Sequence, residues 1–194
     1  MDAALRVADV LVVAGWLLFL VVWVVGSRSV RPDKQRQASA SRAFQVALML
    51  VASMLSFAAQ RLPLGPLNTR LFPRSVAVTL VAVFVAEAGI AFAIWARVVL
   101  GRNWSDRVSL KHGHQLVEVG PYAFVRHPIY TGLLTAFVGM ALLQGTLAAL
   151  VAVSLFTLVF VSKLRLEERF LASEFGSAYD DYRARVKALI PFVV

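Results

Sequence analysis

Cysteine is absent from all 194 residues of the chain. Its absence excludes disulfide bonds, thiol catalysis and thiolate metal sites, and it means that the chain itself cannot be S-acylated or prenylated. The sequence also lacks a glycine-rich phosphate loop, a Ser-His-Asp order and a paired-Asp motif. His112 and His114 form a His-Gly-His with no acidic or cysteine partner nearby, so we expect no metal site.

Long stretches of the chain also lack charge. Residues 10–27 and 43–60 carry none, and residues 75–96 carry only Glu87. Each run is about long enough to cross the ~30 Å apolar core of a bilayer. The uncharged run 128–162 is too long for one span and is divided by Gln144-Gly145, which predicts a tight hairpin. With 59% hydrophobic residues, the chain is expected to be an all-α, polytopic membrane protein of about five transmembrane helices.

Glu87 lies within the third of these expected spans. A carboxylate at this depth is costly and is a functional candidate by default, although a Glu that faces the bundle and is hydrogen-bonded or protonated there explains it as well.

Basic residues outnumber acidic ones, 20 against 11, and they cluster between the apolar runs. Most lie in the loops 27–42 and 101–127 and in the tail after residue 162. Five spans place these regions on one side, and Lys and Arg favour cytoplasmic loops. The pattern predicts an outside N-terminus and a cytoplasmic C-terminus. It also explains the net charge of +9 without nucleic acid, for which we expect no binding.

The densest polar chemistry lies in Gly120-Pro-Tyr-Ala-Phe-Val-Arg-His-Pro-Ile-Tyr-Thr-Gly132, where the fourth span begins. Proline suits the first position of a helix, and the free N–H groups and dipole of that helix start favour an anion. The Arg-His pair lies beside this positive end, and Tyr122 and Tyr130 add aromatic faces. These features predict a pocket for a ligand with a carboxylate or phosphate and a flat ring. A membrane-entry turn with snorkelling Arg and Tyr anchors is the alternative, but it explains the histidine and the glycines less well.

A second polar cluster, Lys163-Leu-Arg-Leu-Glu-Glu168, follows the hairpin. Lys163 and Glu167 are four residues apart and share one helix face. The adjacent Glu167 and Glu168 are expected to point in different directions, one to a site and the other to solvent. A carboxylate here could hold a ligand ammonium group, although a charged helix surface is the alternative. Five spans put both clusters on the same side, which predicts one joint site, capped by a cytoplasmic helix over 163–186 that is interrupted near Gly176.

The two clusters together resemble the isoprenylcysteine carboxyl methyltransferase family and its prokaryotic relatives, over about residues 101–191. The first three spans match only in hydrophobic character. The family order is kept by His114-Gln-Leu-Val117, Gly120-Pro-Tyr122, Arg126-His-Pro-Ile-Tyr130-x-Gly132, the apolar hairpin, Glu167-Glu168 and Phe175-Gly176-x-x-Tyr179-x-x-Tyr182.

The resemblance implies S-adenosylmethionine as cofactor, bound in a membrane-embedded fold with a C-terminal helical hairpin and a cytoplasmic cofactor-binding cap. It implies cofactor contacts from the segment before the first cluster and from both clusters: His114, Gln115, Leu116, Val117, Tyr122, His127, Pro128, Ile129, Tyr130 and Glu167. The family also uses a basic residue near the Glu pair for the substrate carboxylate, in eukaryotes an Arg four positions before the first Glu. Here Lys163 holds that position and Arg165 lies two before. We expect one of them to bind the acceptor, and favour Arg165 because its planar fork matches a carboxylate.

The expected function is that of an integral-membrane methyltransferase acting on a carboxylate of a lipophilic, isoprenylcysteine-like or prenylated substrate reached from the membrane lipid. Residues 1–100 would form three transmembrane helices, and residues 101–194 the cofactor-binding region. We expect a multi-pass protein of a prokaryotic inner membrane with its site on the cytoplasmic side. The alternatives are a phospholipid or amine N-methyltransferase, an NADPH-dependent membrane reductase, and a non-catalytic membrane protein or small transporter.

Overall fold

The computed structural model describes residues 2–28, 33–36, 39–57, 65–101, 104, 109–111 and 116–191. Its helices and strands are, in chain order, α1 (Asp2–Ser27), β1 (Asp33–Arg36), α2 (Ser39–Phe57), the 3-10 helix η1 (Gly65–Asn68), α3 (Val76–Leu100), β2 (Ser109–Lys111), the 3-10 helix η3 (Gly120–Ala123), α4 (Pro128–Gln144), α5 (Leu147–Phe175) and α6 (Ser177–Arg185).

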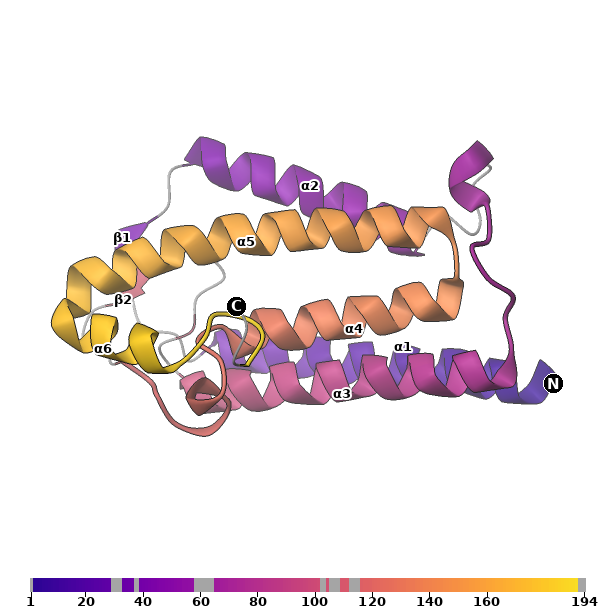
Figure 1. Cartoon of the computed structure of the whole chain (residues 1–194), viewed down its shortest axis with the longest axis horizontal. Helices are drawn as coiled ribbons and strands as arrows, with labels where there is room; N and C mark the ends of the chain where they lie inside the picture. Colours follow the sequence, from indigo (N-terminus) through magenta and orange to yellow (C-terminus); the bar gives the residue numbers. More distant parts are fainter. Residues whose placement is uncertain are drawn as a thin grey trace.

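Apolar helices dominate the molecule and run lengthwise through it (Figure 1). By length and composition, three of the described helices can cross a membrane: Leu5–Ser27, Val76–Leu100 and Leu147–Phe175. Two shorter apolar helices, Ser41–Ser56 and Pro128–Gln144, lie among them. The expected all-α, multi-pass class is confirmed, with α2 and α4 near the short limit of about 17 residues for a span.

The α4–α5 hairpin forms where the sequence predicts it. Pro128 occupies the first turn of α4, and the helix ends at Gly145, whose φ of 63° is the left-handed conformation that glycine adopts without steric cost. Thr146 then caps α5 by accepting a hydrogen bond from the Ala149 N–H at 3.3 Å. The two-residue turn places α4 and α5 antiparallel, so the start of α4 lies beside the distal half of α5 (Figure 1).

Small residues allow α3 and α4 to pack in direct backbone contact. Gly132 of α4 faces Ala93 of α3 so closely that an added Cβ would lie 2.6 Å from the Ala93 nitrogen. Gly139 on α4 and Gly89 on α3 meet the facing backbone in the same way. Such small-residue interfaces let helix backbones approach in membranes, where lipid supplies no hydrophobic drive for helix association. The start of α4 is therefore fixed against a rigid partner.

Aromatic side chains fill the space between the hairpin and α1. Phe137 of α4 stacks on Phe156 of α5, with 3.7 Å between ring centroids. Trp16 of α1 stacks on Phe137 at 5.2 Å and donates its indole N–H to the Met140 sulfur at 3.1 Å. On the other side, Gln45 of α2 donates to the Ser162 hydroxyl of α5 at 3.0 Å. These contacts join α1 and α2 to the hairpin.

Two local features differ from the expected all-α fold with a separate cytoplasmic helix over 163–186. The strands β1 and β2 pair antiparallel, joining the loop after α1 to the loop after α3. The helix α5 continues without a break from the apolar run through the Lys163–Glu168 cluster to Phe175, because nothing before Gly176 interrupts helical geometry. The expected break at Gly176 is confirmed: its φ is 53°, and α6 begins after it.

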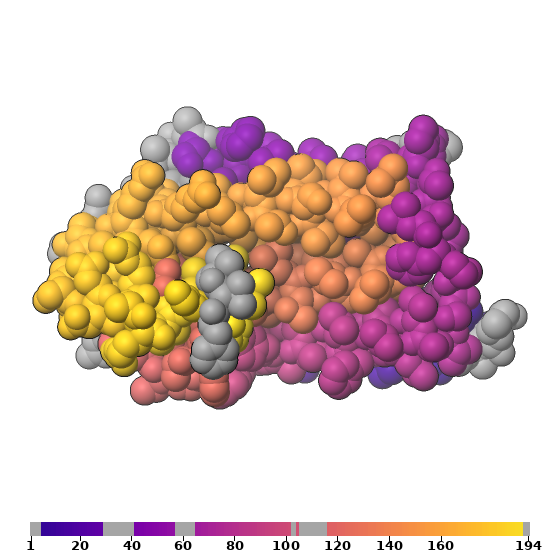
Figure 2. All heavy atoms as spheres, in the orientation of Figure 1, coloured from indigo at the N-terminus to yellow at the C-terminus, as the bar shows by residue number. Residues whose placement is uncertain are grey.

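The connecting regions separate to opposite ends of the bundle (Figure 1). The end that carries β1, β2, η3 and α6 holds parts of all three basic regions, whereas η1 lies at the end near the N-terminus. In the space-filling view, α6 and the chain after it lie over this first end, against α5 and the region of η3 (Figure 2). The polar clusters thus meet at one end, although the side of the membrane that this end faces remains a prediction.

Candidate functional site

The segment before α4 is held in place by the C-terminal chain. Val125 pairs with Lys187 in a parallel bridge. The backbone N–H of Arg126 donates to the Lys187 carbonyl at 2.8 Å, and that of His127 to the Ala188 carbonyl at 3.0 Å. Helix caps leave backbone groups that must find partners, and here a remote strand-like segment supplies them. The conformation of the Arg-His pair therefore depends on the chain after α6.

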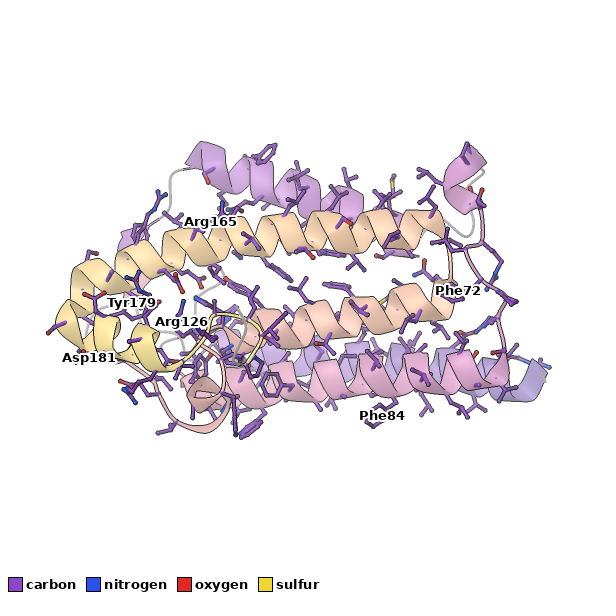
Figure 3. All side chains as sticks on the ribbon, in the orientation of Figure 1. Phe72, Phe84, Arg126, Arg165, Tyr179 and Asp181 are labelled. Carbon is purple, nitrogen blue, oxygen red and sulfur yellow. The ribbon has the colours of Figure 1, made fainter. Side chains whose placement is uncertain are left out.

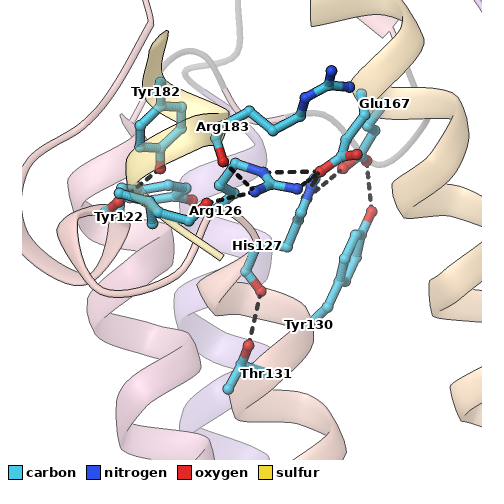
Figure 4. Close-up of polar contacts among 10 residues, drawn as sticks. Tyr122, Arg126, His127, Tyr130, Thr131, Glu167, Tyr182 and Arg183 are labelled. Atoms are coloured by element: carbon cyan, nitrogen blue, oxygen red, sulfur yellow. Dashed lines mark hydrogen bonds and ion pairs between the residues drawn. The ribbon is translucent and has the colours of Figure 1, made fainter. Parts of the chain in front are cut away.

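Two carboxylates of α5 converge on His127 (Figure 4). The ring nitrogen Nδ1 lies 3.4 Å from Glu167 Oε2, and Nε2 lies 3.4 Å from Glu168 Oε1. The expectation that one of the two glutamates faces solvent does not describe this geometry. Adjacent side chains do diverge on a helix, but an imidazole offers nitrogens on opposite sides of its ring and contacts both.

Protonation of His127 is favoured by these contacts. The side chain is buried, and burial alone would lower its pKa. Hydrogen bonds to Glu167 and Glu168 and the negative charge of both carboxylates outweigh that effect, so the pKa of His127 is raised from its usual 6.5. The two carboxylates thus favour the protonated form of the imidazole over the neutral one.

Arg126 closes the other side of the same cluster. Its Nε donates to Glu168 Oε1 at 2.9 Å, and Nη2 forms an ion pair with the same oxygen. Its Nη1 donates to the carbonyl of Val186. The side chains of Arg126 and Glu168 are only 9% and 18% exposed. In this half-buried setting Arg126 is a positioning residue that connects α5, α4 and the C-terminal segment.

Aromatic rings of α4 and α5 line the cluster on the side of the hairpin. The Tyr130 hydroxyl donates to Glu167 Oε1 at 2.5 Å. Its ring lies parallel to His127, with centroids 5.8 Å apart, and stacks on Phe160 at 5.0 Å. The Lys163 Nζ lies 5.9 Å from the centroid of the Tyr130 ring. Glu167 retains 27% exposure of its side chain, so its carboxylate is partly accessible to solvent.

Tyrosines also form the floor beside η3. Tyr122 is buried, and the Tyr182 hydroxyl of α6 donates to its carbonyl at 2.6 Å. Burial raises the pKa of the Tyr122 phenol, and the negative charge of Glu167 adds to the shift, so this phenol stays neutral. Tyr179 is fully buried beside Arg126, and among the described residues its hydroxyl finds no acceptor for its own proton. An orphaned hydroxyl of this kind is a donor available to a ligand.

Most of the residues singled out from the sequence meet at this one end. Tyr122, His127, Tyr130 and Glu167 belong to the cluster, and Pro128 is buried at the start of α4. Ile129, beside it, and Val117 are half-buried, and Leu116 packs with Tyr179 and Tyr182. His114 and Gln115 lie outside the described residues.

The two candidate acceptor-binding residues differ in orientation. Lys163 lies one turn before Glu167 and over the ring of Tyr130. Arg165 is exposed, on the part of α5 that borders α2 rather than α4 (Figure 3). The sequence analysis favoured Arg165 for binding the acceptor because of its planar guanidinium. The geometry instead favours Lys163, which lies beside the Glu167–Tyr130 cluster.

Sequence reasoning missed the structural parts of the site. Arg126 and Glu168 were considered only as sequence neighbours of His127 and Glu167, and the ion pair between them was not expected. The Tyr182 bond to Tyr122 and the strand-like contacts of residues 186–189 were also not foreseen. The available signal for the ion pair was the opposite charge of Arg126 and Glu168, since charged residues of two clusters that are predicted to form one site are expected to pair.

Comparison with known proteins gives a family match over the same region. The isoprenylcysteine carboxyl methyltransferase (ICMT) family matches residues 79–173. The match begins inside α3, earlier than the resemblance seen from the motifs, and ends before Tyr179 and Tyr182. It contains the close α3–α4 interface as well as both polar clusters.

Several of the similar proteins are named as methyltransferases. The protein-S-isoprenylcysteine O-methyltransferase of Schizosaccharomyces pombe is 37% identical over 101 residues, 50% of this chain and 43% of that protein. A probable protein-S-isoprenylcysteine O-methyltransferase of Oryza sativa subsp. indica is 31% identical over 120 residues, 57% of this chain and 63% of that protein. Methanethiol S-methyltransferase of Crocosphaera subtropica is 38% identical over 72 residues, 37% of this chain and 28% of that protein. The matches thus cover between 28% and 63% of these relatives' own lengths.

Proposed function

Residues 79–173 of the chain belong to the ICMT family, and on that premise we propose that the protein is an integral-membrane methyltransferase that uses S-adenosylmethionine. The observation that carries the proposal is the convergence of Glu167, His127 and Tyr130 at the end of the α4–α5 hairpin that also carries η3 and α6. The preferred acceptor is a carboxylate on a lipophilic, isoprenylcysteine-like substrate.

The donor set suits the cofactor. S-Adenosylmethionine carries an ammonium and a sulfonium cation, a carboxylate and a flat adenine ring. Glu167 offers a half-exposed carboxylate for a cation, and Tyr122 and Tyr130 offer aromatic faces that favour a cation or a stacked ring. The start of α4 and His127, whose contacts favour its protonated form, would supply positive charge for the carboxylate. The Tyr179 hydroxyl, which finds no acceptor among the described residues, is a further hydrogen-bond donor at this end of the bundle.

The chemistry asks little of the protein beyond positioning. When bound, the cofactor supplies a sulfonium methyl group that is already activated. A carboxylate acceptor is ionised near neutral pH, so no strong base is needed. Lys163 would hold the acceptor carboxylate beside the Tyr130 ring, and the half-buried cluster would exclude water. Alignment of this kind supplies several kcal/mol of the barrier reduction, about 7–11 in well-oriented systems.

Binding of S-adenosylhomocysteine, measured by calorimetry on the purified protein, tests the cofactor assignment. His127→Ala and Glu167→Gln should each weaken binding at least tenfold, about 1.4 kcal/mol, since each loses a charge-assisted contact. Asp181→Asn is the matched control, because it neutralises an exposed carboxylate at the same end on α6 (Figure 3). Wild-type affinity in both folded site variants would remove the proposed site.

The acceptor class is tested separately by turnover. Lys163→Ala should abolish transfer to a carboxylate acceptor while S-adenosylhomocysteine affinity stays within about threefold, under about 0.7 kcal/mol. Arg165→Ala is the comparison. If Arg165→Ala loses turnover and Lys163→Ala keeps it, the acceptor site belongs to Arg165. If neither matters, the acceptor is not a carboxylate, and an amine or a thiol acceptor, the latter as in the name of the Crocosphaera relative, takes its place.

A further inference from the structure

Arg97 is a buried cation away from the cluster just described. It lies in the last turn of α3 and is only 3% exposed. Its Nη1 donates to the Gly101 carbonyl at 2.9 Å. Among the described residues, its Nε and Nη2 have no hydrogen-bond partner, and no carboxylate forms a salt bridge with it. A buried guanidinium with two unpaired donors is costly, which calls for a ligand.

Tryptophan rings surround this guanidinium. Its carbon lies 4.5 Å from the ring centroid of Trp104 and 5.9 Å from that of Trp23 on α1. Gly26 allows the approach to α1, since an added Cβ there would lie 2.6 Å from Arg97 Nη2. Tryptophan is enriched at the membrane–water interface. Arg97 therefore lies at interfacial depth, at the same end of the bundle as the basic loops (Figure 1).

An apolar groove leads away from Arg97 along the outer face of α1 and α3. It has a volume of about 370 Å³ and is lined by Val21, Val22, Val25, Gly26, Arg97 and Val98. Val21, Val25 and Val98 are each more than half exposed, so the groove opens outward. In a membrane that face meets acyl chains. The groove thus combines an apolar track with a cation at its interfacial end.

We propose that this groove binds one anionic phospholipid, with an acyl chain along the valines and the phosphate at Arg97. The phosphate supplies the acceptor atoms that Nε and Nη2 lack, and guanidinium pairs with phosphate through two parallel hydrogen bonds. Basic pockets between helices are known to take lipid head groups in this way. A zwitterionic lipid brings an ammonium group toward the same cation and is disfavoured.

This site is distinct from the proposed cofactor site. Arg97 faces α1 through Gly26 and Trp23, whereas His127 and Glu167 lie between α4 and α5. Among the described residues, Tyr122 in η3 links the two sites, because the charges of both Arg97 and Glu167 act on its phenol. Lipid binding can therefore be measured without the cofactor, and its outcome is independent of methyl transfer.

Native mass spectrometry of the purified protein with added lipid tests the proposal. The probes are dioleoyl phosphatidylglycerol and dioleoyl phosphatidylcholine, which share acyl chains and differ in net charge. We expect the wild type to retain phosphatidylglycerol at least tenfold better. Arg97→Ala should reduce retention to the phosphatidylcholine level, and Arg97→Lys should give an intermediate value because it keeps the charge but loses the fork. Arg169→Ala, an exposed arginine at the same end, is the matched control and should behave as wild type.

A second variant covers the case in which Arg97→Ala does not fold. Val22→Trp fills the groove and leaves Arg97 in place, and it should lose both lipids while its unfolding temperature stays near that of wild type. Equal retention of the two lipids by the wild type overturns the proposal. So does undiminished phosphatidylglycerol binding in folded Arg97→Ala or in Val22→Trp.

Discussion

Replacing Arg126 by alanine removes the cation that joins three parts of the chain. Two of its nitrogens contact Glu168, and a third donates to the carbonyl of Val186. The substitution leaves Glu168 with His127 at 3.4 Å as its remaining charged contact among the described residues. It also releases the C-terminal segment from one of its side-chain anchors. We expect Arg126→Ala to destabilise the protein and to weaken cofactor binding through the displaced Glu pair.

The magnitude follows from the burial of the pair. Breaking a buried ion pair by removing one partner costs about 3–5 kcal/mol. Arg126 and Glu168 retain 9% and 18% exposure, so the lower end, about 3 kcal/mol, applies. At roughly 2–4 °C per kcal/mol for a chain of this length, the unfolding midpoint should fall by about 6–12 °C.

Thermal unfolding of the purified protein measures this effect, with Arg183→Ala as control. Arg183 forms an exposed pair with Asp180 at 3.7 Å, and exposed pairs contribute about 0–1 kcal/mol. The double variant Arg126→Ala/Glu168→Ala should be more stable than the sum of the single losses predicts, because it leaves no unpaired carboxylate. Strict additivity, or a midpoint for Arg126→Ala within 2 °C of that for Arg183→Ala (a gap under about 1 kcal/mol), would refute the reasoning.

Three further predictions concern protonation, helix packing and topology. The pKa of His127 is raised in the folded protein, so its contribution to stability is complete below about pH 6.5, the usual pKa, and is lost as pH rises through the folded value. Unfolding midpoints measured against pH should therefore decline over that range in the wild type and stay level in His127→Gln. Equal slopes for the two proteins would contradict this prediction. Gly132→Val places methyl groups against the backbone of α3 and should reduce the free energy of unfolding by about 1–3 kcal/mol, measured as a lowered unfolding midpoint. Ala91→Val changes an exposed position of α3 and should leave the midpoint unchanged. Equal midpoints for the two variants would mean that α3 and α4 are not in backbone contact. Reporter fusions should read inside, outside and inside after Arg36, Arg70 and Val194, and an inside signal from the middle fusion would exclude the five-helix topology.

Local sequence signals predicted the elements that they determine directly. Pro128 predicts the start of α4, and Gly145 with its left-handed φ predicts the turn that divides the hairpin. Gly176 marks the end of α5 for the same reason. Charge-free runs predicted the apolar helices, because a bilayer excludes charge from its core. These inferences need only neighbouring residues.

The remaining features depend on partners that are remote in sequence. Arg126 bonds the carbonyl of Val186, and every residue has a carbonyl, so composition does not single that partner out. Nothing in the local sequence marks Arg97 as buried; its 3% exposure and its contacts with Trp23 and Trp104 depend on tertiary packing. The strand pairing of β1 with β2 likewise joins two polar loops that have no strong strand pattern.

Transfer of a labelled methyl group tests the proposed activity most directly. Purified protein in lipid nanodiscs is incubated with methyl-labelled S-adenosylmethionine and a prenylated cysteine analogue that carries a free carboxylate. The label should appear as a base-labile methyl ester with the wild type, and it should be lost with Glu167→Gln but kept with Asp181→Asn. A folded wild-type protein that binds no S-adenosylhomocysteine and transfers no label to carboxylate, thiol or amine acceptors would contradict the assignment as a methyltransferase.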